Sequence, residues 1–221
     1  TREPGRRRPR TERIYLPHFG DHAYGFAAAA GSVDIEATVL PPPDEDSERF
    51  GRPYLMGGEC HPYALILGDY FKLVRSLSPE QERTGIFCVP GYSACRLGQY
   101  PVYIEKVRKE CGYATRVIAD LSQALTAFGL SKKNMEMVRL KTWEGLNAYD
   151  VLTEAYIRLR PMTSDPALLE VVYARCREIL FQTLCRNDIE QGMDEILAQF
   201  ERVPLGPLTE RPLIAVTGDY Y

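Results

Sequence analysis

Short apolar runs and amphipathic segments alternate through the first half of the chain. Four runs have the length and composition of β-strands, at Arg13–Pro17, Asp34–Leu40, Gly85–Val89 and Ala114–Ala119. The segments between them predict helices at Ala23–Ala30, at Pro101–Cys111 and from Cys60 to about Ser76. In the last of these, apolar residues recur every three or four positions, the spacing of one buried helix face. They are Tyr63, Ile66, Leu67, Tyr70, Phe71 and Val74.

This alternation of strands and helices predicts an α/β fold. The strand, helix and strand between Arg13 and Leu40 form a βαβ unit, which implies a parallel sheet. We therefore expect residues 12–120 to form a Rossmann-like domain with a four-stranded parallel sheet. The stretch PPPDEDSERFGRPY inside it predicts an exposed acidic loop or a short helix.

The pattern changes after residue 120, where the sequence predicts longer helices. Three are expected, at Leu146–Arg160, Pro166–Arg186 and Asp188–Phe200, and Asp165 precedes Pro166 as a typical helix start. The expected apolar face of the second helix includes Val171, Val172, Ile179, Leu180 and Leu184. We interpret residues 121–203 as a helical insertion or lid.

Both ends of the chain differ from this central part. Residues 1–11 carry five arginines and no apolar side chain, which predicts a disordered linker. Residues 204–221 form a linker followed by an apolar run, Leu213–Val216, that begins a second α/β unit or returns to the first sheet. Because the chain begins with Thr1 and ends near this run, we expect both ends to be cut from a longer protein.

Composition narrows the function classes. The 221 residues are 45% hydrophobic and 26% charged, with a net charge of −3. This balance provides no basic field for nucleic acid, and no apolar run reaches the roughly 18 residues of a membrane span. Six cysteines are too sparse for a disulfide scaffold. We therefore expect a cytoplasmic chain with no nucleic-acid or membrane partner.

Cys60 and Cys95 are the strongest candidates for chemistry. Both lie where a loop becomes a helix, and there backbone N–H groups and the helix dipole favour a thiolate. Both are also expected in loops at the carboxyl ends of strands or at helix starts, where open α/β sheets place ligands. Cys88 is predicted to lie in the core, and the remaining cysteines are predicted to pack on helices; these are Cys111, Cys176 and Cys185.

The histidines leave other readings open. His18 and His22 are four residues apart and would form a zinc site with Cys60, as in a zinc-dependent hydrolase. Alternatively they hydrogen-bond around the first strand–helix loop, with Asp21 capping the helix. Nucleophilic catalysis by Cys60 with His61 is a further alternative. Gly-rich phosphate-binding motifs are absent from the sequence.

Three segments resemble a known family: YLPHFGDHAYGFAAA, GGECHPYALILGD and GYSACRLGQY. They are similar to motifs in the C-terminal part of CoA-substrate-specific enzyme activases and in the related 2-hydroxyacyl-CoA dehydratase-like iron–sulfur proteins. The resemblance covers roughly Arg13–Asp120. In that family the cysteines at the positions of Cys60 and Cys95 bind a cubane iron–sulfur cluster. A further family cysteine lies in a second α/β domain and has no counterpart before Tyr221.

The resemblance implies a low-potential electron-transfer component of anaerobic metabolism. It would work with an ATP-hydrolysing activase domain or subunit and with an acyl-CoA-related enzyme, rather than as an enzyme by itself. Cys60 and Cys95 would bind the metal, and a homodimer would bring two such pairs to one cluster. The residues expected to surround the cluster or dock a partner are His18, Asp21, His22, Glu59 and Arg96. The alternative from another class is a non-redox α/β module that binds a nucleotide or an acyl-CoA.

Overall fold

A four-stranded parallel sheet lies at the centre of the protein. The computed structural model describes residues 13–77, 84–88, 95–119 and 130–207. Its strands are β1 (Arg13–Leu16), β2 (Glu36–Val39), β3 (Thr84–Phe87) and β4 (Arg116–Ile118), in the spatial order β2-β1-β3-β4. Every pairing is parallel; Ile14, for example, is in register with Ala37 on one side and Gly85 on the other. The predicted α/β, Rossmann-like fold is confirmed.

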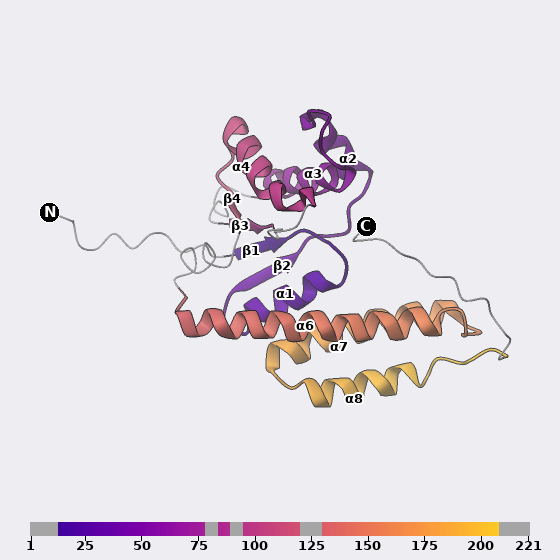
Figure 1. Cartoon of the computed structure of the whole chain (residues 1–221). Helices are drawn as coiled ribbons and strands as arrows, with labels where there is room; N and C mark the ends of the chain where they lie inside the picture. Colours follow the sequence, from indigo (N-terminus) through magenta and orange to yellow (C-terminus); the bar gives the residue numbers. More distant parts are fainter. Residues whose placement is uncertain (1–12, 78–83, 89–94, 120–129, 208–221) are drawn as a thin grey trace.

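Helices cover both faces of the sheet (Figure 1), and successive residues of a strand point to opposite faces. Tyr15 and Ile86 pack under α3 (His61–Ser76) and α4 (Tyr100–Cys111). Ile14 and Phe87 face the other side, with Ala27 of α1 (His22–Gly31). The short runs at β1 and β3 are therefore buried on both faces, which is why they read as continuous apolar sequence.

The acidic stretch before Gly57 contains a short helix, α2 (Glu45–Gly51), followed by a 3₁₀ turn, η1 (Arg52–Tyr54). Asp44 and Ser47 form a reciprocal capping box at its start. The helix lies directly on α3, because a Cβ atom added to Gly68 would be only 1.7 Å from the Ser47 carbonyl oxygen. Glycine at this position thus allows the two backbones to touch.

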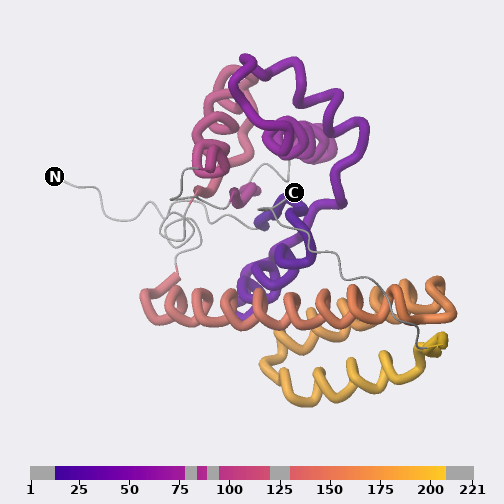
Figure 2. Tube along the Cα trace, turned by 45° about the vertical axis from the view of Figure 1, so that its right-hand side comes forward, coloured from indigo at the N-terminus to yellow at the C-terminus, as the bar shows by residue number. Residues whose placement is uncertain are grey.

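The second half of the chain forms long helices on the α1 side of the sheet (Figures 1 and 2). They are α6 (Lys132–Leu159), α7 (Pro166–Arg186) and α8 (Ile189–Phe200). α6 crosses α1 at Gly25 and Gly145, where an added Cβ on either glycine would lie within 3 Å of the other's backbone. These helices share a core with α1 that includes Ala28.

Two expectations for the helices were wrong. α6 begins at Lys132 rather than at Leu146, because its first turns cross the surface with few buried side chains and leave a weak apolar pattern. Val171 is exposed, whereas Val172 is buried, so the apolar face of α7 is narrower than expected. The predicted start of α7 is confirmed: the Asp165 carboxylate accepts a hydrogen bond from the Leu168 N–H at 2.9 Å.

Several sequence expectations lie outside the described residues. These are the arginine-rich linker at residues 1–11, the apolar run at 213–216 and the loop residues 89–94 before Cys95. Within the described part of the chain, no helix combines the length and apolar character needed to cross a membrane.

Candidate functional site

The candidate site lies at the carboxyl ends of β1 and β3. After these two neighbouring strands the chain continues on opposite faces of the sheet. β1 is followed by α1 on one face, and β3 is followed by α4, which lies with α3 on the other face. In open α/β sheets such a change of direction opens a crevice between the two loops, where ligands bind. A pocket of about 390 Å³ lies at this position, with Pro17 and Phe19 from one loop and Cys88 and Leu97 from the other.

Cys60 occupies the N-cap position of α3, as the sequence predicted for a loop–helix junction. Its backbone is extended, and its own carbonyl accepts a hydrogen bond from the Tyr63 N–H at 3.1 Å. The side chain is half-buried, and its Sγ lies 2.6 Å from the hydroxyl oxygen of Tyr100 at the start of α4. Because a phenol is a stronger donor than a thiol, we assign the donor role to Tyr100.

Cys95 lies on the neighbouring loop and is exposed. It precedes the 3₁₀ turn η3 (Arg96–Gln99), which continues directly into α4. The Arg96 side chain reaches the Cys60 loop, because a Cβ atom on Gly58 would lie 3.9 Å from Arg96 Nη1. Together with the Cys60–Tyr100 contact, this places the loops of the two cysteines side by side at one edge of the sheet.

An aromatic layer supports these loops. The ring of Tyr63 lies 5.3 Å from that of Tyr100 and 5.7 Å from that of Tyr103, measured between centroids. Tyr63 and Tyr100 are both buried, and burial raises the pKa of Tyr63 well above its ordinary value. Cys60 therefore lies on an apolar floor, while Gly57 and Gly58 leave open space beside it.

The Glu59 side chain hydrogen-bonds the backbone of the loop that contains it. Its Oε2 accepts hydrogen bonds from the Met56 N–H at 2.9 Å and from the Gly58 N–H at 3.0 Å. Desolvation acts to raise the pKa of Glu59, but backbone N–H groups together outweigh it and hold this pKa below its ordinary value. Glu59 thus shapes the turn that presents Cys60, and exposed Arg96 lies between the two cysteine loops.

Asp21 links the first strand–helix loop to α7. It occupies the N-cap position of α1, but its side chain makes no capping hydrogen bond, so the capping role predicted for it was wrong. The carboxylate instead accepts hydrogen bonds from Arg177 at 3.0 Å and from the Tyr173 hydroxyl at 2.5 Å. These stronger donors from a helix far along the chain outcompete the local backbone N–H groups.

The two histidines of the loop have different partners. His22 Nε2 lies 2.7 Å from Asp150 Oδ1 of α6, and the His18 ring packs edge-on against Tyr24. Burial lowers the pKa of His18. His18, His22 and Cys60, the set considered for zinc, do not form a metal-binding group among the described residues. His61, the first residue of α3, is exposed.

The other cysteines divide by burial. Cys88 and Cys176 are buried, and burial raises the pKa of Cys88 to about 12 and that of Cys176 to about 11, so both stay protonated at neutral pH. Cys185 packs at the edge of the helical core. The packing role expected for Cys111 was wrong: as the last residue of α4 it is exposed, with its sulfur 4.0 Å from the Tyr54 hydroxyl.

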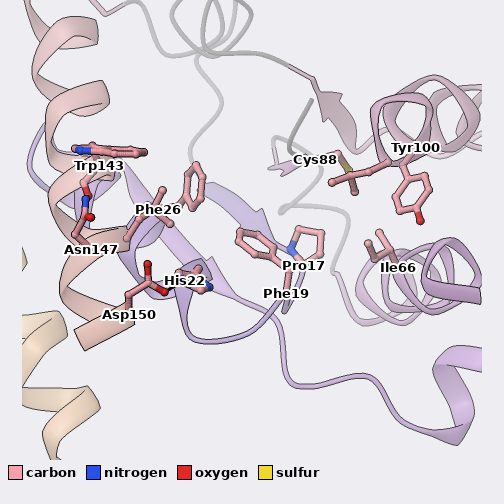
Figure 3. A pocket seen from close by; sticks show the side chains of 12 residues that line it. Pro17, Phe19, His22, Phe26, Ile66, Cys88, Tyr100, Trp143, Asn147 and Asp150 are labelled. Carbon is pink, nitrogen blue, oxygen red and sulfur yellow. Dashed lines mark hydrogen bonds and ion pairs between the residues drawn. The ribbon is translucent and has the colours of Figure 1, made fainter. Parts of the chain in front are cut away.

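Sequence reasoning missed the contribution of α6 to the pocket. Figure 3 shows Trp143, Asn147 and Asp150 on one side of the pocket, facing Ile66, Cys88 and Tyr100 across it. Trp143 lay outside the expected helix, and no local pattern connects α6 with the loop after β1. A signal was nevertheless present, because Gly145 interrupts an otherwise good helix-forming segment and marks the close crossing with α1.

The potential metal-binding side chains of the described residues do not by themselves form a complete metal site. Within the described residues, no three His, Cys, Asp or Glu side chains form a group that could hold a metal ion. In that part of the chain, neither Cys60 nor Cys95 therefore belongs to a group of three or more such side chains. No protein-family model, curated protein or solved structure matches the chain.

Proposed function

We propose that this chain is part of an iron–sulfur electron-transfer protein and supplies Cys60 and Cys95 to a cubane cluster. The proposal rests on the approach of the Cys60 loop to the residues that follow Cys95. Tyr100 contacts the sulfur of Cys60, and the Arg96 side chain lies beside Gly58. Thiolate ligands, close backbone approach and an apolar surround are what such clusters require. The resemblance of these same loops to activase and dehydratase-like motifs agrees with this function.

Each residue of the site has a defined part in this function. The cluster supplies a one-electron redox centre, and Cys60 and Cys95 would hold it at the edge of the sheet. Tyr100 fixes the Cys60 side chain and places a hydroxyl on its sulfur, and such hydrogen bonds tune cluster potentials. Gly57 and Gly58 border open space beside Cys60 that a bound cluster would use, because a Cβ at Gly57 would meet no atom within 4 Å.

The remaining ligands must come from outside the described site. A cubane is held by about four thiolates, and in this proposal the chain supplies two of them. A second copy of the chain, or a further α/β domain with its own cysteine, would complete the set. An ATP-hydrolysing partner would then drive electrons through the cluster. The exposure of Cys95 is compatible with such a shared site, because ligands from outside the chain could reach the same cluster.

Anaerobic reconstitution with iron and sulfide tests the proposal. The wild-type chain is expected to bind iron and to show a broad visible absorption band, with about four irons per two chains if a dimer shares the cluster. Cys60→Ser and Cys95→Ser should each lose most of this iron. Cys111→Ser is the matched control, because Cys111 is an exposed thiol at the opposite end of α4.

Two results would contradict the proposal. One is a wild-type protein that binds no iron at any concentration at which it dimerises. The other is a Cys60→Ser/Cys95→Ser double variant that keeps its iron. The pocket at the strand crossover is a separate feature, and its chemistry can be tested independently of iron.

A further inference from the structure

The pocket between the sheet and α6 has the form of a small-molecule site. Its volume of about 390 Å³ falls in the range of ligand pockets, and it lies where the strand order reverses. The cysteine pair does not line it: Cys60 and Cys95 are absent from its walls, and only the buried thiol Cys88 contributes sulfur. A ligand in this pocket would therefore bind apart from Cys60 and Cys95.

The walls favour a flat apolar group. The rings of Phe19 and Phe26 meet edge-on at 5.6 Å, and Ile66 and Leu146 extend the apolar surface. Trp143 is 68% exposed although it borders the pocket. A large aromatic side chain left open to solvent at the mouth of a pocket is poised to cover a bound ring, which would remove its apolar surface from water.

One end of the pocket is polar and rich in acceptor oxygens. His22 Nε2 donates to Asp150 Oδ1 at 2.7 Å, and the Asp150 side chain is 67% exposed. Asn147 uses its Nδ2 to donate to the Trp143 carbonyl at 2.7 Å, so its Oδ1 is left as an acceptor. Among the described residues that line the pocket there is no lysine or arginine. This end therefore suits a hydrogen-bond donor or a cation and is a poor match for a carboxylate or a phosphate.

We propose that the pocket between β1, β3 and α6 binds an aryl-alkyl amine, with the ring between Phe19 and Trp143 and the ammonium group at Asp150 and Asn147. The ring fills the apolar wall, and the ammonium replaces water at the acceptor oxygens. The Asp150 carboxylate then pairs with the ligand as well as with His22. This assignment is separate from the iron–sulfur proposal, since it uses the chain without a cluster.

The chain offers a direct probe, because Trp143 is its single tryptophan. Titration of the full chain with 2-phenylethylamine is expected to change tryptophan fluorescence saturably, with a dissociation constant of roughly 0.1–1 mM for a ligand of this size. 3-Phenylpropionate has the same ring on a chain that ends in a carboxylate, and 2-cyclohexylethylamine has the amine without the aromatic ring. The carboxylate should bind at least about tenfold more weakly, because it would face the acceptor oxygens. The cyclohexyl amine keeps the apolar area and loses the aromatic contact, so it should bind about two- to tenfold more weakly. Isothermal titration calorimetry gives a second readout that does not depend on Trp143.

Asp150→Asn tests the polar end. It should weaken 2-phenylethylamine binding roughly tenfold and remove most of the preference for amine over carboxylate. Glu154→Gln, one helical turn further along α6 and paired with Arg158, is the matched control and should leave the affinity unchanged. Far-UV circular dichroism checks that both variants fold.

Three outcomes would overturn the proposal. These are no binding of the amine by either method, equal binding of amine and carboxylate, and an Asp150→Asn variant that binds the amine as the wild type does. None of them bears on the iron-binding test, so failure of one proposal leaves the other to stand on its own measurement.

Discussion

Cys60 and Cys95 show how much depends on the position of single side chains. One sulfur is half-buried against Tyr100, and the other is exposed on the next loop. Their sequence context, a glycine-rich junction before a helix, was enough to select both residues. It could not show that Tyr100 would contact Cys60, because this contact joins residues 40 positions apart.

Cross-linking provides a measurement of the Cys60–Cys95 approach that needs no metal. Dibromobimane becomes fluorescent when both of its arms alkylate thiols, so the wild-type chain should yield a fluorescent intrachain product that links these two residues. Each single serine variant at Cys60 or Cys95 should lose it. Cys111→Ser should keep it, since α4 holds Cys111 about 18 Å along its axis from the Cys95 end. Peptide mapping that finds no Cys60–Cys95 product would show that the loops do not bring the thiols together.

Asp44 provides a pH-dependent test at the start of α2. The Lys72 ammonium, and then the Ser47 N–H, lower the pKa of Asp44 to about 2. The pKa of an aspartate in the unfolded chain is about 3.9. The stabilisation by Asp44 is therefore present above that pH and is lost as the pH falls toward 2. Asp44→Asn keeps an N-cap residue but removes the charge. Its thermal unfolding should therefore depend less on pH between about 4 and 2 than that of the wild type.

Circular dichroism melts from pH 2 to pH 7 supply this comparison, and Asp46→Asn serves as the control carboxylate in the same turn. Burial raises the pKa of the neighbouring Asp69, which shares Lys72 and Ser47 with Asp44, so the Asp44→Asn profile reports the lost charge together with the response of Asp69 to it. An unchanged pH profile in Asp44→Asn would refute the role given to the Lys72 contact.

At the scale of elements, glycines decide where helices meet. Gly68 lets α3 lie against Ser47 of α2, and Gly25 and Gly145 let α1 cross α6. Each lies in a helix interior, where glycine by itself costs about 0.5–1 kcal/mol relative to alanine. Close backbone packing offsets that cost, so the sign of a substitution depends on the neighbouring helix.

Gly68→Ala is therefore expected to destabilise the protein in spite of its better helix propensity. The new methyl group would overlap the Ser47 carbonyl, and the free energy of unfolding should fall by about 1–3 kcal/mol. Gly31→Ala is the control, because its Cβ would meet only Cys185 Sγ, at 3.4 Å. Urea unfolding measures both; a Gly68→Ala variant as stable as the wild type would mean that α2 does not rest on α3.

Most elements of the sheet domain were predictable from sequence, for a physical reason. Strands buried on both faces and helices buried on one have distinct local patterns, and β1, α3 and α7 each began within a residue of the expected position. The start of α6 was missed, because its exposed first turns have no such pattern. The partners of Asp21 and His22 were missed as well, since both belong to helices more than a hundred residues away.

At the scale of the whole molecule, the helices of the second half hold the first loop in place. Arg177 and Tyr173 of α7 bond Asp21, and Asp150 of α6 bonds His22. Residues 121–203 were expected to form an insertion or lid. In the structure, α6 and α7 also complete the helical layer on the α1 side of the sheet.

Removal of the Arg177 guanidinium should show how strongly these two halves are joined. Arg177→Met leaves the Asp21 carboxylate, which is 15% exposed, with Tyr173 as its remaining donor, and should lower the free energy of unfolding by about 1–3 kcal/mol. Arg175→Met is the matched control on the same helix. Its partner Glu195 is 3.8 Å away, both side chains are at least half exposed, and the expected loss is below about 0.5 kcal/mol. If both variants lost the same free energy of unfolding, the Arg177–Asp21 contact would contribute no more than an exposed ion pair.

The backbone contacts at Gly25, Gly51, Gly68 and Gly145 have a consequence for recognising this architecture elsewhere. At each of them a single methyl group would approach main-chain atoms of a neighbouring helix more closely than carbon atoms tolerate. Chains that share the arrangement should keep all four positions free of side chains, even where their loops carry other chemistry. The spacing of these glycines is thus expected to identify the scaffold independently of the chemistry that its loops carry.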